Sequence, residues 1–415
     1  MDRSDFNRKA MVKWISFFLF VSAHLSAQVL PGIDVLLETE NIGKLQGKRI
    51  GLITNQTAVT SRMRSTLEVL KAKATSYKIV KLFAPEHGIK GQGWAGEEIK
   101  NAEDESGIPI LSLHGKSRRP TAEMLRGIDL LIFDIQDIGS RSYTYATTLF
   151  YVMEEAAKQK IRVMILDRPN PIGGLLIDGP MLEEKWRSFV GYVNVPYCHG
   201  MTLGELARYF NGEYKVGCAL EVIPMKGWTR SMSYRDTGLA WIPTSPNIPE
   251  PDTPLYYPMT GILGELGIVS IGIGYTLPFK VFGAPWIQAE KLCAALRRQN
   301  LGGVSFRPFY FRPFYGKYAE QNCEGVLLSL TEKDKLKPIQ VQYAIIDTLK
   351  KLYPQAVKET LKGASKSQIA MFNKVNGTEA IWHLLNSKEG LASSYKMQNT
   401  ERKRFEEARK KYLLY

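Results

Sequence analysis

The feature that most constrains the fold is a series of short apolar runs, separated by helix-like segments, between residues 49 and 167. Nearly continuous apolar runs are typical of strands that are buried on both faces of a sheet. We predict strands at residues 49–55, 79–83, 108–113, 129–135 and 162–167. The spacing of apolar residues predicts helices between them, at 61–72, 121–125 and 147–159. This alternation predicts an α/β fold with a parallel sheet that is covered on both faces.

The second half of the chain shows a different pattern, because strand-like and helix-like segments no longer alternate after about residue 200. Residues 242–258 contain six prolines, which predicts a rigid loop. Aromatic strands at 304–315 and a helix at 339–352 follow. We therefore expect a second domain of the α+β type.

The N-terminus has the residue order of a secretory signal peptide. Four basic side chains precede an apolar stretch at residues 14–21, and small residues follow up to Ala27. This pattern predicts a signal peptide at residues 1–27 and an exported protein, periplasmic or secreted, with no stable membrane insertion after cleavage. The alternative is an uncleaved N-terminal anchor.

The chain is strongly basic, since 55 Lys and Arg residues against 41 Asp and Glu residues give a formal net charge of +14 over 415 residues. Such a charge favours an anionic partner. An exported protein is not expected to meet nucleic acid, and the densest basic run, residues 396–411, is interrupted by glutamates. We interpret that run as a solvated C-terminal helix and predict no nucleic-acid partner.

Polar side chains follow four of the predicted strands. They include Asn55, the pair Glu86 and His87, the segment 134–137, and Asp167. Because the carboxyl ends of parallel strands meet at one edge of a sheet, we expect a site there. A carboxylate beside an imidazole suits a general acid or base, although Glu86 could equally cap the next element.

The segment 133–145 is dense in polar groups, with two aspartates, Arg141 and two tyrosines. Such a set suits a polyhydroxylated, anionic ligand, and an aspartate–arginine salt bridge within the loop is the alternative. In the next turn, Asp167 and Asn170 are either ligand groups or ordinary turn residues.

Several cofactor and metal chemistries find no support in the sequence. The histidines lack the spacing of a zinc site, so no metal is predicted. Residues 91–96 match GxGxxG, but Trp94 would crowd a pyrophosphate, and no Walker A motif or GxSxG nucleophile elbow occurs. We therefore predict no cofactor. Four cysteines leave the disulfide pairing open.

Seven motifs in order resemble one family, the NamZ-like exo-β-N-acetylmuramidases. The resemblance extends from about Gly32 to the C-terminus. The motifs are Pro85–Gly88, Ala95–Glu97, Phe133–Arg141, Leu166–Pro171, His199–Thr202, Ser245–Asn247 and Gly283–Trp286.

The resemblance implies a Rossmann-like domain, which we place at residues 32–198, and a smaller α+β domain at 199–415, with an active-site cleft between them. It implies release of non-reducing-end β-1,4-linked N-acetylmuramic acid from peptidoglycan fragments, so that muramyl saccharides are the expected partners. Glu86 matches the family's candidate general acid, and His87 its neighbour. The second catalytic group is expected to be Asp134 or the acetamido oxygen of the substrate.

The resemblance also implies contacts between the sugar and other polar side chains. The substrate-binding residues expected are Asn55, Glu97, Asp137, Arg141, Tyr143, Asp167, Asn170, His199, Asn247 and Glu265.

One segment departs from the family pattern, because polar positions are occupied by Ile268, Ile271 and Ile273, although Glu265 is retained. This departure favours a different subsite or muramyl substrate. It also keeps open an alternative function, a peptidoglycan- or muropeptide-binding protein without catalysis. A metal-dependent hydrolase of another cell-wall bond fits poorly with the lack of histidine clusters.

Overall fold

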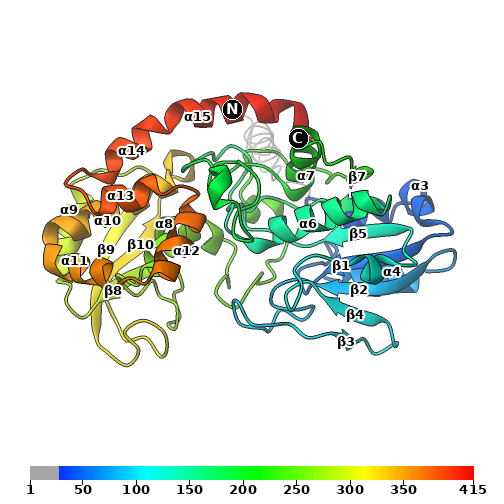
Figure 1. Cartoon of the computed structure of the whole chain (residues 1–415), viewed down its shortest axis with the longest axis horizontal. Coiled ribbons are helices and arrows are strands. Elements are labelled where there is room, and N and C mark those ends of the chain that lie inside the picture. The colour runs from blue at the N-terminus through cyan, green and yellow to red at the C-terminus, as the bar shows by residue number, and fades with distance from the viewer. Residues whose placement is uncertain (1–27) are drawn as a thin grey trace, which may run out of the picture.

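The computed structural model describes residues 28–415, so the predicted signal peptide at 1–27 lies outside the described residues. Two parts lie side by side, each with its own sheet (Figure 1). Within residues 28–415, no helix combines the length and the apolar character needed to cross a bilayer.

The first part is built on a seven-stranded sheet. Its strands are β1 (Arg49–Thr54), β2 (Lys78–Ala84), β3 (Ala102–Glu103), β4 (Pro109–Ser112), β5 (Leu130–Asp134), β6 (Arg162–Leu166) and β7 (Leu220–Ile223). Their order across the sheet is β3-β4-β2-β1-β5-β6-β7. All neighbouring pairs are parallel except β3 and β4, which are antiparallel. The predicted α/β fold with a mostly parallel sheet is confirmed.

Helices cover both faces of this sheet. They are α2 (Gly32–Leu36), α3 (Thr39–Ile42), α4 (Thr66–Ala72), α5 (Ala122–Leu125), α6 (Thr144–Lys158) and α7 (Leu203–Glu213). Leu130 and Ile132 of β5 pack in one apolar cluster with α2 and α4. Leu131 and Phe133 point the other way and pack with α6 and α7. Burial on both faces therefore explains why the run shows no polar alternation.

Two boundaries differ from those expected from the sequence. We placed the end of the first domain at residue 198, but β7 pairs in parallel with β6, so the sheet continues to Ile223. Helix α6 begins at Thr144, three residues before the predicted start. The earlier start brings Thr144 and Tyr145 into the first turn of the helix.

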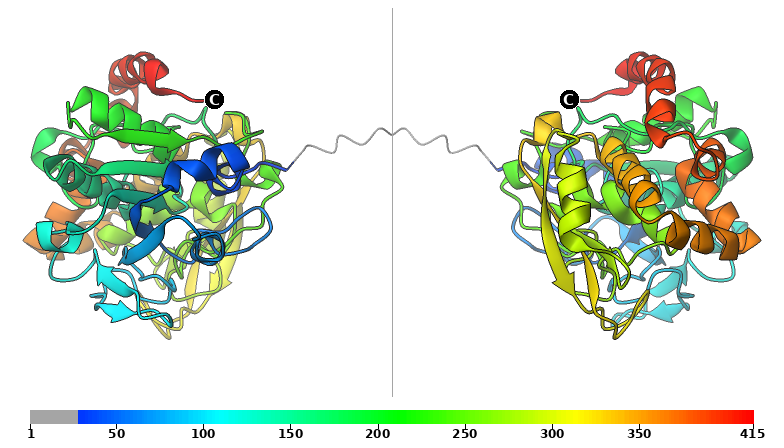
Figure 2. Two further views of the ribbon diagram at one scale, coloured as in Figure 1. Left: turned by 90° about the vertical axis from the view of Figure 1, so that its right-hand side faces the viewer. Right: turned by 90° about the vertical axis from the view of Figure 1, so that its left-hand side faces the viewer.

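The second part holds a three-stranded antiparallel sheet and most of the remaining helices. Its sheet has the order β8-β10-β9, with β8 (Val281–Ala284), β9 (Val304–Phe311) and β10 (Cys323–Leu330). Its helices are α8 (Thr253–Glu265), α9 (Ala289–Arg297), α10 (Pro338–Leu352), α11 (Pro354–Gly363), α12 (Lys366–Asn376), α13 (Ala380–Leu385), α14 (Leu391–Met397) and α15 (Asn399–Arg409). Helix α9 packs against β9 and β10, and Figure 2 shows helices gathered beside these strands. The predicted α+β character is confirmed.

The proline-rich segment is only partly a loop. The sequence predicted a loop over residues 242–258, but helix α8 begins at Thr253. Pro254 lies in the first helical turn, where a missing N–H leaves no bond unmade. Pro258 lies inside the helix, and the burial of apolar neighbours such as Met259 and Leu263 offsets its lost backbone bond.

The C-terminal helices return to the first part, and in Figure 1 they run across the top of the molecule from one part to the other. The predicted solvated helix has a buried face, because Arg402, Phe405 and Arg409 are shielded from solvent. Arg409 donates hydrogen bonds to three carbonyl oxygens of the first part, those of Gly174, His199 and Gly200. These bonds tie the end of the chain to the sheet domain.

Candidate active site

Glu86 lies on the loop that follows β2, at the carboxyl end of the sheet, and is 8% exposed. Its Oε1 accepts a hydrogen bond from the backbone N–H of Gly96 at 2.8 Å. Its Oε2 accepts one from the hydroxyl of Thr144 at 2.7 Å. The Nε2 atom of His114 lies 3.8 Å from Oε1. Both oxygens are thus oriented by neutral donors, a backbone N–H and a hydroxyl.

His87 supports the loop that carries Glu86. Its backbone adopts a left-handed conformation, with φ of 69°, and Gly88 follows with φ of 77°. Such a conformation costs a non-glycine residue about 1 kcal/mol, so surrounding contacts must fix it. The Nδ1 atom of His87 lies 2.8 Å from the carbonyl oxygen of Gly93, which closes the loop. This contact gives His87 a role in positioning the loop, and its predicted catalytic role stays a prediction.

Two partners of Glu86, His114 and Thr144, were not among the predicted site residues. His114 follows β4, a strand whose carboxyl end lies at the same edge of the sheet as that of β2. This position after a strand could have predicted His114 as a site residue. Burial lowers the pKa of His114, and the nearby Glu86 only partly opposes this. The imidazole is therefore neutral near pH 7. Thr144 was missed because the predicted start of helix α6 lay three residues too late.

Tyrosine side chains join the first part to the second beside Glu86. The rings of Tyr143 and Tyr145 lie 4.9 Å apart, and Tyr257 of α8 lies 6.3 Å from Tyr143. The hydroxyls of Tyr143 and Tyr145 donate to the side chain and carbonyl of Thr244, each at 2.8 Å. These contacts place Tyr143 in the region of the candidate site and hold its hydroxyl in a hydrogen bond with Thr244.

Glu265 ends helix α8 and approaches the site from the second part of the chain. Burial raises its pKa, and the described residues include no hydrogen-bond or ion-pair partner for its carboxyl. Burial also raises the pKa of Tyr257 to about 12, with further contributions from Glu265 and Glu86. Tyr257 therefore lies near both carboxylates, one from each part.

Asp134, predicted as a second catalytic group, lies in a buried ion pair with Arg168. It is fully buried, and Arg168 donates to its Oδ1 from Nε at 2.5 Å and to its Oδ2 from Nη2 at 3.0 Å. The hydroxyl of Thr66 donates to Oδ2 at 2.5 Å. With both oxygens bound, Asp134 ties the end of β5 to the end of β6. These contacts give Asp134 a structural role, and its predicted catalytic role stays a prediction.

Arg141 holds the two parts together through both Nη atoms, while its buried Nε has no hydrogen-bond partner in the described structure. Its guanidinium donates to the carbonyls of Pro180 and Val195, and to those of Val375 and Asn376 at the end of α12. Burial lowers its pKa to about 10. Its four backbone contacts serve the fold, and the predicted substrate contact stays a prediction.

Three further predicted ligands form hydrogen bonds within the protein. Asp167 accepts hydrogen bonds from the hydroxyls of Thr202 and Tyr415, at 2.6 and 2.8 Å. Asn170 donates to the carbonyl of Met201. His199 accepts from the N–H of Met201, and burial together with neighbouring arginines lowers its pKa to about 3. All three are buried and hold turns.

The other predicted contacts lie in loops around this edge of the sheet. Asn55 follows β1, where its Oδ1 accepts from Thr57 and its buried Nδ2 has no hydrogen-bond partner in the described structure. Glu97 is exposed on the Glu86 loop and accepts from the N–H of Trp94 at 2.7 Å. Asn247 is half-buried in the loop before α8. Of these three, Asn55 has a free donor.

Asp137 is almost fully buried, with Oδ2 bound to the N–H of Gly139 and Oδ1 without a partner in the described structure. Burial raises its pKa to about 7 and that of Asp167 to about 6. Between about pH 4 and pH 7, the folded state therefore holds protons that the unfolded state releases, so stability falls as the pH rises.

We expect Asp137→Asn to lose less stability than wild type as the pH rises, because an asparagine side chain does not titrate. Its melting temperature relative to wild type should rise by a few degrees from pH 5 to pH 8, and an unchanged difference would contradict this assignment.

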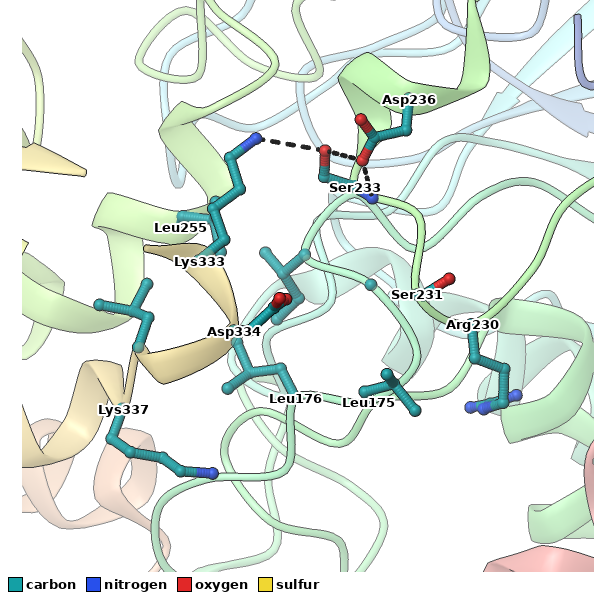
Figure 3. A pocket seen from close by; sticks show the side chains of 13 residues that line it. Leu175, Leu176, Arg230, Ser231, Ser233, Asp236, Leu255, Lys333, Asp334 and Lys337 are labelled. Carbon is teal, nitrogen blue, oxygen red and sulfur yellow. Dashed lines mark hydrogen bonds between the residues drawn. The ribbon is translucent and has the colours of Figure 1, made fainter. Parts of the chain in front are cut away.

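A separate pocket lies where the two parts meet (Figure 3). It is lined by residues 172–176 and 230–236 of the first part and by 333–337 of the second. Within it, Lys333 donates to Ser233, which donates to Asp236. Neither Glu86 nor its partners line this pocket, so it is distinct from the candidate active site.

Comparisons with known proteins identify the family. Two family models match in succession, exo-beta-N-acetylmuramidase NamZ, N-terminal, at residues 50–252, and exo-beta-N-acetylmuramidase NamZ, C-terminal, at residues 255–415. The chain belongs to the NamZ exo-β-N-acetylmuramidase family. It is 40% identical, over 94% of its length and 92% of the relative, to the peptidoglycan beta-N-acetylmuramidase NamZ of Bacillus subtilis strain 168.

Two crystal structures of DUF1343 family proteins from Bacteroides fragilis NCTC 9343 share the fold. One is 42% identical with a TM-score of 0.88, and the other is 29% identical with a TM-score of 0.69. Each comparison covers 94% of this chain and 99% of the solved chain. The boundary between the two NamZ family models falls near residue 253, where α8 begins, so the sheet strand β7 lies within the N-terminal NamZ region.

Proposed function

We propose that this protein is an exo-acting glycoside hydrolase that releases β-1,4-linked N-acetylmuramic acid from the non-reducing ends of peptidoglycan fragments. Membership of the NamZ family supports an exo-β-N-acetylmuramidase acting on peptidoglycan. We further propose that residues 1–27 direct its export, where such fragments occur.

The observation that carries the proposal is the environment of Glu86. Its two oxygens are fixed by Gly96 N–H and the Thr144 hydroxyl, and no arginine or lysine of the described chain forms a salt bridge with it. Asp134, by contrast, is locked in an ion pair with Arg168. A carboxyl that is oriented but not neutralised by a cation suits a general acid. Glu86 therefore protonates the glycosidic oxygen of the bound sugar.

The second catalytic group must stabilise the oxocarbenium-like transition state. Of the two groups considered from the sequence, Asp134 is unavailable because Arg168 and Thr66 occupy its oxygens. The acetamido oxygen of the substrate remains, and we assign the role to it. Asn55 Nδ2 and the Glu265 carboxyl have free hydrogen-bonding capacity in the described structure and would help to orient the sugar.

The alternative, a binding protein without catalysis, rests on the apolar segment at residues 268–273, in which Ile268 and Ile271 are buried. Incubation with the disaccharide N-acetylmuramyl-β-1,4-N-acetylglucosamine, followed by mass analysis, separates the two functions. We expect both free monosaccharides to appear. Binding of the disaccharide by calorimetry with no monosaccharide released would support the alternative and contradict the proposed hydrolysis.

A further inference from the structure

A muramyl sugar differs from a glucosaminyl sugar by a lactyl group on O3, which carries a carboxylate. A cation near the acid residue would let an enzyme select the muramyl sugar, because charge-assisted hydrogen bonds to a carboxylate are the strong ones. The segment 268–273 offers only apolar side chains and small residues, and Arg141 and Arg168 are bound to other protein groups. The cation must therefore come from elsewhere at this edge of the sheet.

Arg118 is an exposed arginine on the loop that follows β4. Its guanidinium carbon lies 4.2 Å from the centre of the Phe189 ring, which is itself 7% exposed. In the part of the chain that the structure describes, no carboxylate lies within salt-bridge distance of Arg118. The neighbouring Arg119, in contrast, is paired with Glu154 and Glu155. Arg118 is thus held in place by an aromatic ring while its charge stays uncompensated.

A continuous row of side chains connects Arg118 to the candidate general acid. The ring of Phe189 lies 5.6 Å from that of His114, and His114 Nε2 lies 3.8 Å from Glu86 Oε1. The charge of Arg118 acts on His114, because it adds to the burial that lowers the pKa of that imidazole. Arg118 and Glu86 therefore flank one imidazole and one phenyl ring.

We propose that Arg118 binds the lactyl carboxylate of the muramyl sugar whose glycosidic oxygen is protonated by Glu86. A planar guanidinium binds a carboxylate through two parallel hydrogen bonds, and stacking on Phe189 reduces the freedom that it loses on binding. Arg118 is then the residue that selects the sugar's carboxylate. This inference rests on the proposed function and adds the origin of its specificity.

The test uses two substrates, the 4-nitrophenyl β-glycoside of N-acetylmuramic acid and the same compound with its lactyl carboxylate converted to a carboxamide. We expect wild type to prefer the carboxylate form by about 30-fold in kcat/KM. This factor corresponds to the usual free-energy contribution of a charge-assisted bidentate contact. Arg118→Met keeps an unbranched chain over Phe189 but removes the charge, and it should abolish this preference, mainly through KM. Arg118→Ala should do the same.

Arg126→Ala serves as the matched control, because Arg126 is an exposed arginine in the same connection between β4 and β5 and contacts no residue of the site. It should keep the wild-type preference. The inference is overturned if Arg118→Met still prefers the carboxylate, or if wild type hydrolyses both substrates equally well. In the latter case the proposed hydrolysis stands, whereas a wild type that hydrolyses neither substrate contradicts the proposed function itself.

Discussion

Glu86→Gln is expected to lower kcat for a muramyl disaccharide by about 10³-fold, within the range that positioned general acids contribute. The amide oxygen of glutamine can still accept from Gly96 N–H, and its NH2 group can donate to the Thr144 hydroxyl, but glutamine cannot deliver a proton. The fold should therefore be preserved, with a melting temperature within about 2 °C of wild type. Steady-state kinetics and thermal unfolding measure the two effects.

Two substrates with different leaving groups distinguish a general acid from a residue that only shapes the site. A 4-nitrophenolate leaves with little help from a proton, whereas a sugar hydroxyl needs one. Glu86→Gln should therefore lose much more activity on the disaccharide than on the 4-nitrophenyl muramide. Glu103→Gln, which changes an exposed glutamate on β3, should alter neither rate. Equal losses on the two substrates would contradict proton donation by Glu86.

Asp134→Asn is expected to destabilise the fold by about 3–5 kcal/mol, because it leaves the Arg168 guanidinium buried without its counter-charge. Urea unfolding measures this change. Arg168→Met should be similarly costly, and the double variant should cost clearly less than the sum of the two. Glu68→Ala breaks the exposed pair with Arg64 and should change stability by less than about 0.5 kcal/mol.

The activity of the same variant tests whether Asp134 is structural. Below its reduced melting temperature, folded Asp134→Asn should keep kcat within a few-fold of wild type, because the Asp134 oxygens face Arg168 and Thr66. A loss of 10³-fold with an intact fold would show instead that Asp134 takes part in the reaction.

The strands could be predicted from the sequence because the sheet is buried on both faces. Residues 130–134 of β5 are all buried, and a short, fully apolar run between helical segments is typical of a central parallel strand. Glu86 could be predicted for a related reason, since it directly follows β2 at the edge where strand ends meet. The sequence did not reveal that β7 extends the same sheet, because α7 and β7 come after a long irregular segment.

The partners of the polar side chains were harder to predict than their positions. Arg141 lies in the loop between β5 and α6, Asp167 directly follows β6, and both resemble ligands for a sugar. Some of their partners, Val375, Asn376 and Tyr415, lie more than 200 residues away along the chain. Only the return of the C-terminal helices brings these groups together, and no local pattern encodes that return.

The most direct test of the account is digestion of a reducing-end-labelled tetrasaccharide that alternates N-acetylmuramic acid and N-acetylglucosamine and begins with N-acetylmuramic acid. We predict that wild type releases one N-acetylmuramic acid and leaves a labelled trisaccharide with a terminal N-acetylglucosamine, and that Glu86→Gln leaves the tetrasaccharide intact over the same time. Labelled disaccharide formed by internal cleavage, or rapid release by Glu86→Gln, would contradict an exo-acting hydrolase that depends on Glu86.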